Sequence, residues 1–66
     1  MNDLEIRDLE TRLVERGDFL GAAVCRLAVG EHEGILPLTD GDRADLAVLS
    51  RRDCEQLVDL FAVDVI

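Results

Sequence analysis

The amino-acid sequence predicts a small α+β domain, ordered α-β-β-β-α, in which two helices flank a three-stranded antiparallel meander. Residues 3–16 and 50–61 carry apolar residues at the three- and four-residue spacing of an amphipathic helix. Between them lie apolar runs of strand length, bounded by glycine and turn residues, at residues 19–29, 35–39 and 46–49. The chain has 66 residues, enough for one domain, which we assign to residues 1–66.

The first predicted helix spans residues 3–16. Asn2 and Glu5 have the spacing of a capping box, in which two side chains satisfy free N–H groups of the first turn. Gly17 follows the helix and suits the terminating position that requires a positive φ. The expected buried stripe is Ile6, Leu9 and Leu13, and the expected surface ion pairs are Asp3–Arg7 and Asp8–Arg12.

Residues 19–29 admit two interpretations. Their alanine content permits a buried helix, whereas Gly21, the bounding Gly30 and the apolar run between them favour a strand. Such a strand would have two mainly apolar faces, so it would lie at the centre of the sheet or at an interface. We therefore predict a strand here, with a buried helix as the alternative.

The meander continues with strands at residues 35–39 and 46–49. Pro37 has no backbone N–H to donate, so its strand is placed at an edge of the sheet. Asp40-Gly41 is a frequent turn pair and connects the two strands. A loop of odd length keeps apolar neighbours on one face, pairing Leu38 with Ala44 and Leu36 with Leu46.

The clearest pattern in the chain is a strand at residues 46–49 that leads into a capped helix. Ser50 and Asp53 stand in the capping-box relation, with Asp in place of the usual Glu or Gln. One helix face is apolar and the other charged: Cys54, Leu57, Val58 and Phe61, against Arg52, Glu55 and Asp59. The β-branched tail that follows is expected to fray or to pair as a strand, so the predicted dimer interface is Val63, Val65 and Ile66.

Composition bears on association, partners and location. Although 48% of the residues are hydrophobic, only 3% are aromatic, and so aliphatic a core on so short a chain favours a homodimer. The net charge of −8 and the absence of lysine argue against direct binding of nucleic acid or anionic membranes. The acidity fits either adaptation to high salt or a surface that docks on a basic protein partner. No run is apolar enough to span a membrane and no leader pattern precedes the first helix, so we expect a soluble, cytoplasmic protein.

The sequence offers no residue pattern for catalysis, for a metal or for a cofactor. Cys25 and Cys54 are far apart and are expected to be buried, reduced thiols. His32 lies between two acids on an expected turn, where consecutive side chains rarely converge on an ion. Ser50 is the only serine and is already used as a cap. We therefore expect no enzymatic activity, no metal and no cofactor.

The residue-level signal for binding is acidic. Glu55 and Asp59 are like charges one helical turn apart, which costs an isolated helix about 0.2–0.5 kcal/mol and suggests a surface kept for a partner. The predicted partner-binding residues are Glu31, Glu33, Asp40, Asp42, Glu55 and Asp59. The sequence thus predicts a non-enzymatic interaction or regulatory domain, an inhibitor or adaptor similar in size and charge to those of phages and mobile elements. Its partner would be a basic protein that handles nucleic acid. The alternative is a salt-adapted structural subunit or dimerisation module that binds through its apolar surface.

Overall fold

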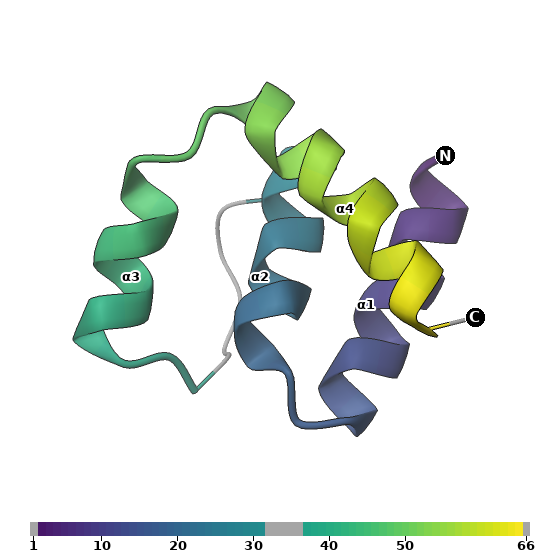
Figure 1. The fold of residues 1–66 in the computed structure, drawn as a ribbon, viewed down its shortest axis with the longest axis horizontal. Coiled ribbons are helices and arrows are strands. Elements are labelled where there is room, and N and C mark those ends of the chain that lie inside the picture. The colour runs from purple at the N-terminus through teal and green to yellow at the C-terminus, as the bar shows by residue number, and fades with distance from the viewer. Residues whose placement is uncertain (1, 32–36, 66) are drawn as a thin grey trace.

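The computed structural model describes residues 2–31 and 37–65, with side chains described as far as Val63 (Figure 1). These residues contain four helices and no strand: α1 (Asp3–Glu15), α2 (Phe19–Ala28), α3 (Asp40–Ala47) and α4 (Arg51–Val65). The predicted α+β fold with a three-stranded meander is therefore wrong, and the described part of the chain is all-helical.

Helix α1 forms where the sequence predicts it. The Glu5 N–H donates to Asn2 Oδ1 at 2.9 Å, which confirms half of the expected capping box. Gly17 has φ +83°, so its predicted role at the end of the helix is also confirmed. The predicted surface pair of Asp8 and Arg12 forms at 3.2 Å. The predicted apolar stripe is buried: Ile6, Leu9 and Leu13.

Residues 19–28 form helix α2, so the predicted strand is wrong and the alternative, a buried helix, is confirmed. Asp18 caps this helix, and its Oδ1 accepts a hydrogen bond from the Gly21 N–H at 3.0 Å. Gly21 leaves room for this cap, because a Cβ there would lie 3.0 Å from Asp18 Oδ2. Gly30 has φ +82° and ends α2 as Gly17 ends α1, with a Schellman pair of hydrogen bonds.

The two apolar faces that suggested a central strand are the two covered sides of a central helix. Helix α2 packs against both α1 and α4, and residues 21–25 are all buried. A helix covered on two sides lacks a polar face, so its apolar pattern resembles that of a buried strand. Alanine then favours the helix because it has the highest helix propensity of all residues.

Helix α3 replaces the predicted turn and the third predicted strand. The Asp42 N–H donates to Thr39 Oγ1 at 3.1 Å, and the Thr39 N–H donates to Asp42 Oδ2 at 3.3 Å. This capping box makes Asp40-Gly41 the first turn of a helix, and the odd-length loop predicted there does not exist. The other predicted strand is also absent where it can be checked. Residues 37–39 have no regular structure, and residues 35–36 lie outside the described residues.

Helix α4 confirms the predicted capped helix but extends beyond it. The Asp53 N–H donates to Ser50 Oγ and the Ser50 N–H to Asp53 Oδ2, both at 3.1 Å. Cys54 and Val58 are buried against the core, as the apolar stripe predicts. The tail predicted to fray or form a strand is helical as far as Val65.

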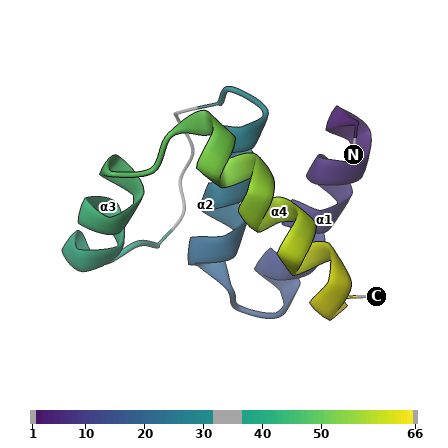
Figure 2. The same ribbon diagram turned by 45° about the horizontal axis from the view of Figure 1, so that its top comes forward.

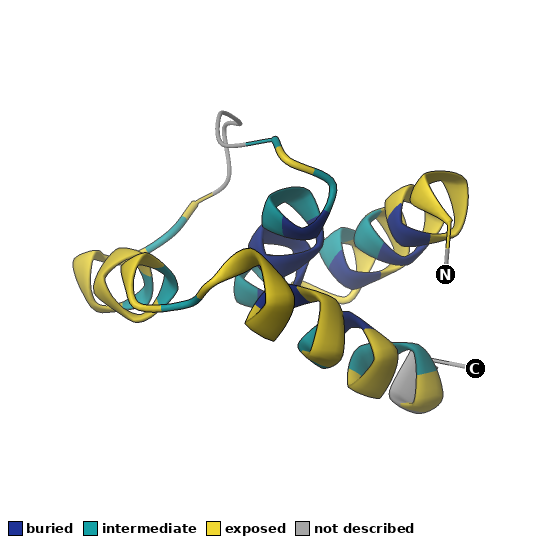
Figure 3. Cartoon of the chain, turned by 90° about the horizontal axis from the view of Figure 1, so that it is seen from above, coloured by how far each residue is buried: buried dark blue, intermediate teal, exposed yellow. Residues whose placement is uncertain are grey.

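Helices α1, α2 and α4 pack around one core, and α3 stands apart from them (Figures 1 and 2). The buried surfaces of the three packed helices face one another, whereas α3 has no buried residue (Figure 3). Only Leu46, near the end of α3, and Leu49, just after it, reach from this part of the chain to the core. The buried core consists of Ile6, Leu9, Leu13, Ala22, Val24, Cys25, Ala28, Cys54 and Val58.

Candidate functional site

A cleft of about 300 Å³ lies between the start of α1, the end of α2 and one edge of α4. Its apolar residues, Ile6, Ala28 and Val58, are all buried. Its remaining lining residues are charged: Asp3, Arg51, Glu55 and Asp59. We call this the acidic cleft, because carboxylates outnumber cations around an apolar base.

The order of residues along α4 explains how the charged side chains meet. Arg51, Glu55 and Asp59 follow one another at four-residue steps, so they share one edge of the helix. Two of the predicted partner-binding residues, Glu55 and Asp59, are therefore brought together. Asp3 joins them from α1. No sequence pattern indicates this position for Asp3, because only the packing of α1 near α4 places it there.

The single arginine of the acidic cleft is weakly paired. Arg51 Nε lies 3.8 Å from Glu55 Oε1, and both side chains are more than half exposed. An exposed pair of this kind contributes about 0–1 kcal/mol. The Arg51 guanidinium also lies beside the end of α2, 3.8 Å from where a Cβ on Gly30 would be. Within the described part of the chain, Asp3 and Asp59 form no ion pair.

A second cleft, also of about 300 Å³, separates α3 from the packed helices. It is lined mainly by apolar groups from the ends of α2 and α3 and the start of α4: Leu27, Gly30, Leu46, Ala47, Leu49, Arg51 and Cys54. We call this the apolar cleft. Arg51 lines both clefts, so the two clefts are neighbours.

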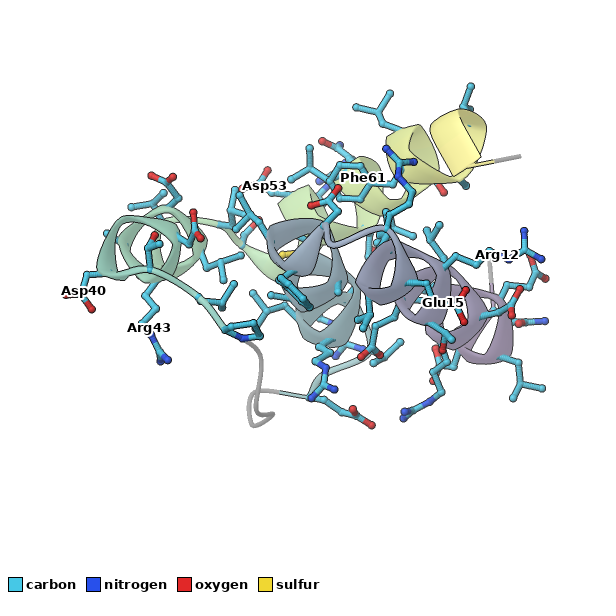
Figure 4. All side chains as sticks on the ribbon, turned by 90° about the horizontal axis from the view of Figure 1, so that it is seen from below. Arg12, Glu15, Asp40, Arg43, Asp53 and Phe61 are labelled. Carbon is cyan, nitrogen blue, oxygen red and sulfur yellow. The ribbon has the colours of Figure 1, made fainter. Side chains whose placement is uncertain are left out.

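The remaining predicted partner-binding acids do not join the acidic cleft. Asp40 is exposed on the outer side of α3, and Figure 4 shows it pointing away from the other helices. Asp42 is occupied with capping the same helix. Glu31 forms an ion pair with Arg7, which replaces the predicted pairing of Arg7 with Asp3. Glu33 and the neighbouring His32 lie outside the described residues.

The predicted dimer interface is only partly visible. Val63 is 76% exposed, and Leu60 on the same helix is 64% exposed. The side chain of Val65 and all of Ile66 lie outside the described residues. An outward apolar patch on α4, formed by Leu60 and Val63, is therefore present, but its contacts in solution stay a prediction.

Both cysteines are buried, free thiols, as predicted. Burial, reinforced by the charges of Glu10 and Asp18, raises the pKa of the Cys25 thiol from 9.0 to about 12. Burial also raises the pKa of Cys54, and the nearby Asp53 and Glu55 add to the effect. The start of α4 therefore does not activate Cys54 as a thiolate nucleophile.

The raised thiol pKa predicts that the domain weakens in alkali. Without tyrosine or lysine, titration between pH 9 and pH 12 is confined to the cysteines. The folded state holds the Cys25 proton more tightly than the unfolded state does. The resulting stabilisation is complete below pH 9 and is lost as the pH rises toward 12. Urea unfolding should therefore give a free energy of unfolding that falls with pH in this window.

Cys25→Ala provides the control for this titration. Below pH 9 the variant should be less stable than the parent chain, because the substitution leaves a cavity, but its stability should fall less steeply above pH 9. Equal slopes for the two proteins would contradict the assignment to Cys25.

Among the described residues, no group of three or more His, Cys, Asp or Glu side chains is placed to hold a metal ion. In the same part of the chain, no helix has the length and apolar character needed to cross a bilayer. No family model matches the chain, and neither the curated proteins nor the solved structures contain a significant match to it.

Proposed function

We propose that this chain is a non-enzymatic protein-interaction domain that binds a basic side chain of a partner protein in the acidic cleft. The observation that carries the proposal is the combination of a buried apolar base with the carboxylates of Asp3 and Asp59, which form no ion pair within the described part of the chain. Arginine and lysine side chains have the matching form, an aliphatic stem that ends in a cationic head.

The size and charge of the site support this occupant. Small-molecule sites usually measure about 300–1,000 Å³, so a cleft of about 300 Å³ suits one long side chain better than a larger ligand. Glu55 and Asp59 could accept the parallel hydrogen bonds that an arginine guanidinium donates. The net charge of −8 would speed the encounter with a basic partner. An inhibitor or adaptor of a basic nucleic-acid-handling protein would use such a cleft.

Removing the two α4 carboxylates tests the proposal. Glu55→Gln with Asp59→Asn keeps the shapes of the side chains and removes two charges from the cleft. We expect the affinity for a fluorescent arginine-rich peptide to fall about tenfold or more at low ionic strength, measured by anisotropy, because charge-assisted hydrogen bonds contribute about 1.5–3 kcal/mol each.

Asp8→Asn with Glu15→Gln is the matched control, since both residues are exposed on α1 and lie outside the acidic cleft. This double variant changes the net charge equally and should alter the affinity about twofold or less. An equal loss in both double variants would show that the peptide responds to overall charge, and the acidic cleft would then not be the site.

A second candidate function, self-association, is favoured by the outward apolar patch on α4. Leu60 and Val63 are largely exposed, and burying them between two copies would remove apolar surface from water. In this case the acidity would serve solubility at high salt, and the chain would act as a dimerisation module. Light scattering of the double variant Leu60→Ser with Val63→Ser tests this candidate. A dimeric parent chain should become monomeric in the variant, whereas a parent chain that is already a monomer should keep its molar mass and would contradict self-association.

A further inference from the structure

The apolar cleft is a feature that the three-helix core leaves open. Helix α3 has no buried residue, and, among the residues that the structure describes, Leu46 and Leu49 reach the core without closing the space between them and α2. Leu27 lines the same space from α2, and Cys54 lines it from α4. The cleft thus presents aliphatic side chains from three parts of the chain around a space of about 300 Å³.

Its position links it to the acidic cleft. Arg51 lines both clefts: it shares the acidic cleft with Glu55 and Asp59, and the apolar cleft with Leu49 and Cys54. Along α4, Cys54 and Asp59 are separated by about 7.5 Å of helix rise. One segment of a partner can span this distance with side chains three to five residues apart on a helix.

We propose that the apolar cleft takes an apolar side chain of the same partner segment whose basic side chain occupies the acidic cleft. The inference rests on the proposed function and adds the class of partner. The domain recognises a helical segment that carries an arginine or lysine and, about one turn away, a leucine-sized apolar residue.

The net charge of the whole chain favours this occupant of the apolar cleft over a second copy of the chain. The charged residues adjacent in sequence to the cleft lining are four acids, Glu31, Asp45, Asp53 and Glu55, and two arginines, Arg26 and Arg52, while Arg51 itself lines the cleft. A second copy would bring a further net charge of −8 to this face, and the two copies would repel each other. A basic amphipathic segment brings the opposite charge together with an apolar face.

Three synthetic peptides of about 15 residues, near the shortest length at which an isolated helix forms, provide the probes. The first carries an arginine and a leucine at i and i+4 in an alanine-rich background. The second has alanine in place of the leucine, and the third has glutamine in place of the arginine. By fluorescence anisotropy at low ionic strength, the Arg/Leu peptide should bind about tenfold more tightly than either of the others.

Filling the apolar cleft tests the same inference from the protein side. Ala47 is an exposed residue of α3 that lines the cleft, so Ala47→Phe places a ring there without disturbing the core. Ala44, exposed on the same helix and absent from the lining, gives the matched control Ala44→Phe. We expect Ala47→Phe to lower the affinity for the Arg/Leu peptide about tenfold and to leave the affinity for the Arg/Ala peptide unchanged. Ala44→Phe should change neither affinity.

The outcomes separate this inference from the proposed function. If Glu55→Gln with Asp59→Asn weakens the peptides while Ala47→Phe and the loss of leucine have no effect, the acidic cleft binds alone and the inference is overturned. If Glu55→Gln with Asp59→Asn changes the affinity for none of the peptides, the proposed function itself is contradicted. A chain that is dimeric without peptide, and becomes monomeric as Ala47→Phe, would assign the cleft to a second copy and overturn the inference.

Labelling of the thiols tests occupation of the apolar cleft without any variant of the protein. Both thiols are fully buried, but only Cys54 is among the residues that line the apolar cleft. The Arg/Leu peptide should slow alkylation of Cys54 more than alkylation of Cys25, as measured by mass spectrometry of the digested protein. Equal slowing at both thiols would reflect only general stabilisation and would count against occupation of the cleft.

Discussion

Replacing Leu13 with alanine should lower the free energy of unfolding by about 2–5 kcal/mol. Leu13 is 1% exposed, the largest of the fully buried side chains, and belongs to the core shared by α1, α2 and α4. A core of this size rarely supplies more than about 3–5 kcal/mol in total. The variant should therefore be largely unfolded at room temperature, as measured by far-ultraviolet circular dichroism during urea titration.

Leu4→Ala is the matched control, because Leu4 lies on the same helix and is 78% exposed. Its stability should stay within about 0.5 kcal/mol of the parent chain. A loss below about 1 kcal/mol in Leu13→Ala would contradict the packing described above. A melting temperature that rises with protein concentration in the parent chain would show that association contributes to its stability.

Removing the carboxylate of Glu10 should lower the free energy of unfolding by about 1–3 kcal/mol. Glu10 Oε2 accepts a hydrogen bond from Arg26 Nε at 2.6 Å, and this ion pair joins α1 to α2. The two side chains are only 14% and 27% exposed, so water cannot fully replace the lost partner. Glu10→Gln is the substitution that changes the shape of the side chain least.

A double-mutant cycle with Arg26→Met isolates the energy of this pair from other contacts of the arginine. The exposed pair of Asp8 and Arg12, at 3.2 Å on the surface of α1, is the internal comparison and should couple by about 0.3–0.5 kcal/mol. If Glu10 and Arg26 couple no more strongly than the surface pair, the ion pair does not hold α1 to α2.

The helices predicted from the sequence are those with both a cap and a polar face. Ser50 and Asp53 cap α4, and the charged residues opposite its buried stripe made the helical period visible. Helix α2 is covered on two sides, so its apolar and polar residues do not alternate with a helical period. Its ends, Asp18 and Gly30, carry the same kind of signals as Asn2 and Gly17 and would have identified it.

The sequence does not predict helix α3, because the dipeptide Asp40-Gly41 is compatible with either a hairpin turn or the first turn of a helix. Asp40-Gly41 is typical of a tight hairpin turn, but Thr39 and Asp42 around it form a capping box of the same kind as Ser50 and Asp53. The local hydrogen bonds favour the helix. Strand pairing would instead have needed distant partners, and none of the described residues forms a strand.

Only the part of the acidic cleft that lies on α4 could be predicted from the sequence. Glu55 and Asp59 are one turn apart on α4, so helical geometry alone brings them together. Asp3 and the buried Ile6 belong to α1, and their place in the cleft depends on how α1 packs near α4. The apolar cleft could not be predicted, because its sides depend on α2 and α3, and the sequence pattern favours strands at residues 19–29 and 46–49.

The separation of α3 from the packed helices predicts that the molecule opens in two cooperative units. Its capping box and backbone hydrogen bonds are local, and it is tied to the core chiefly through Leu46 and Leu49. Local opening of α3 would expose little apolar surface and would leave the core of α1, α2 and α4 folded. Substitutions on α3 can therefore reshape one side of the apolar cleft with little effect on global stability, so partner specificity could diverge while the three-helix core is conserved.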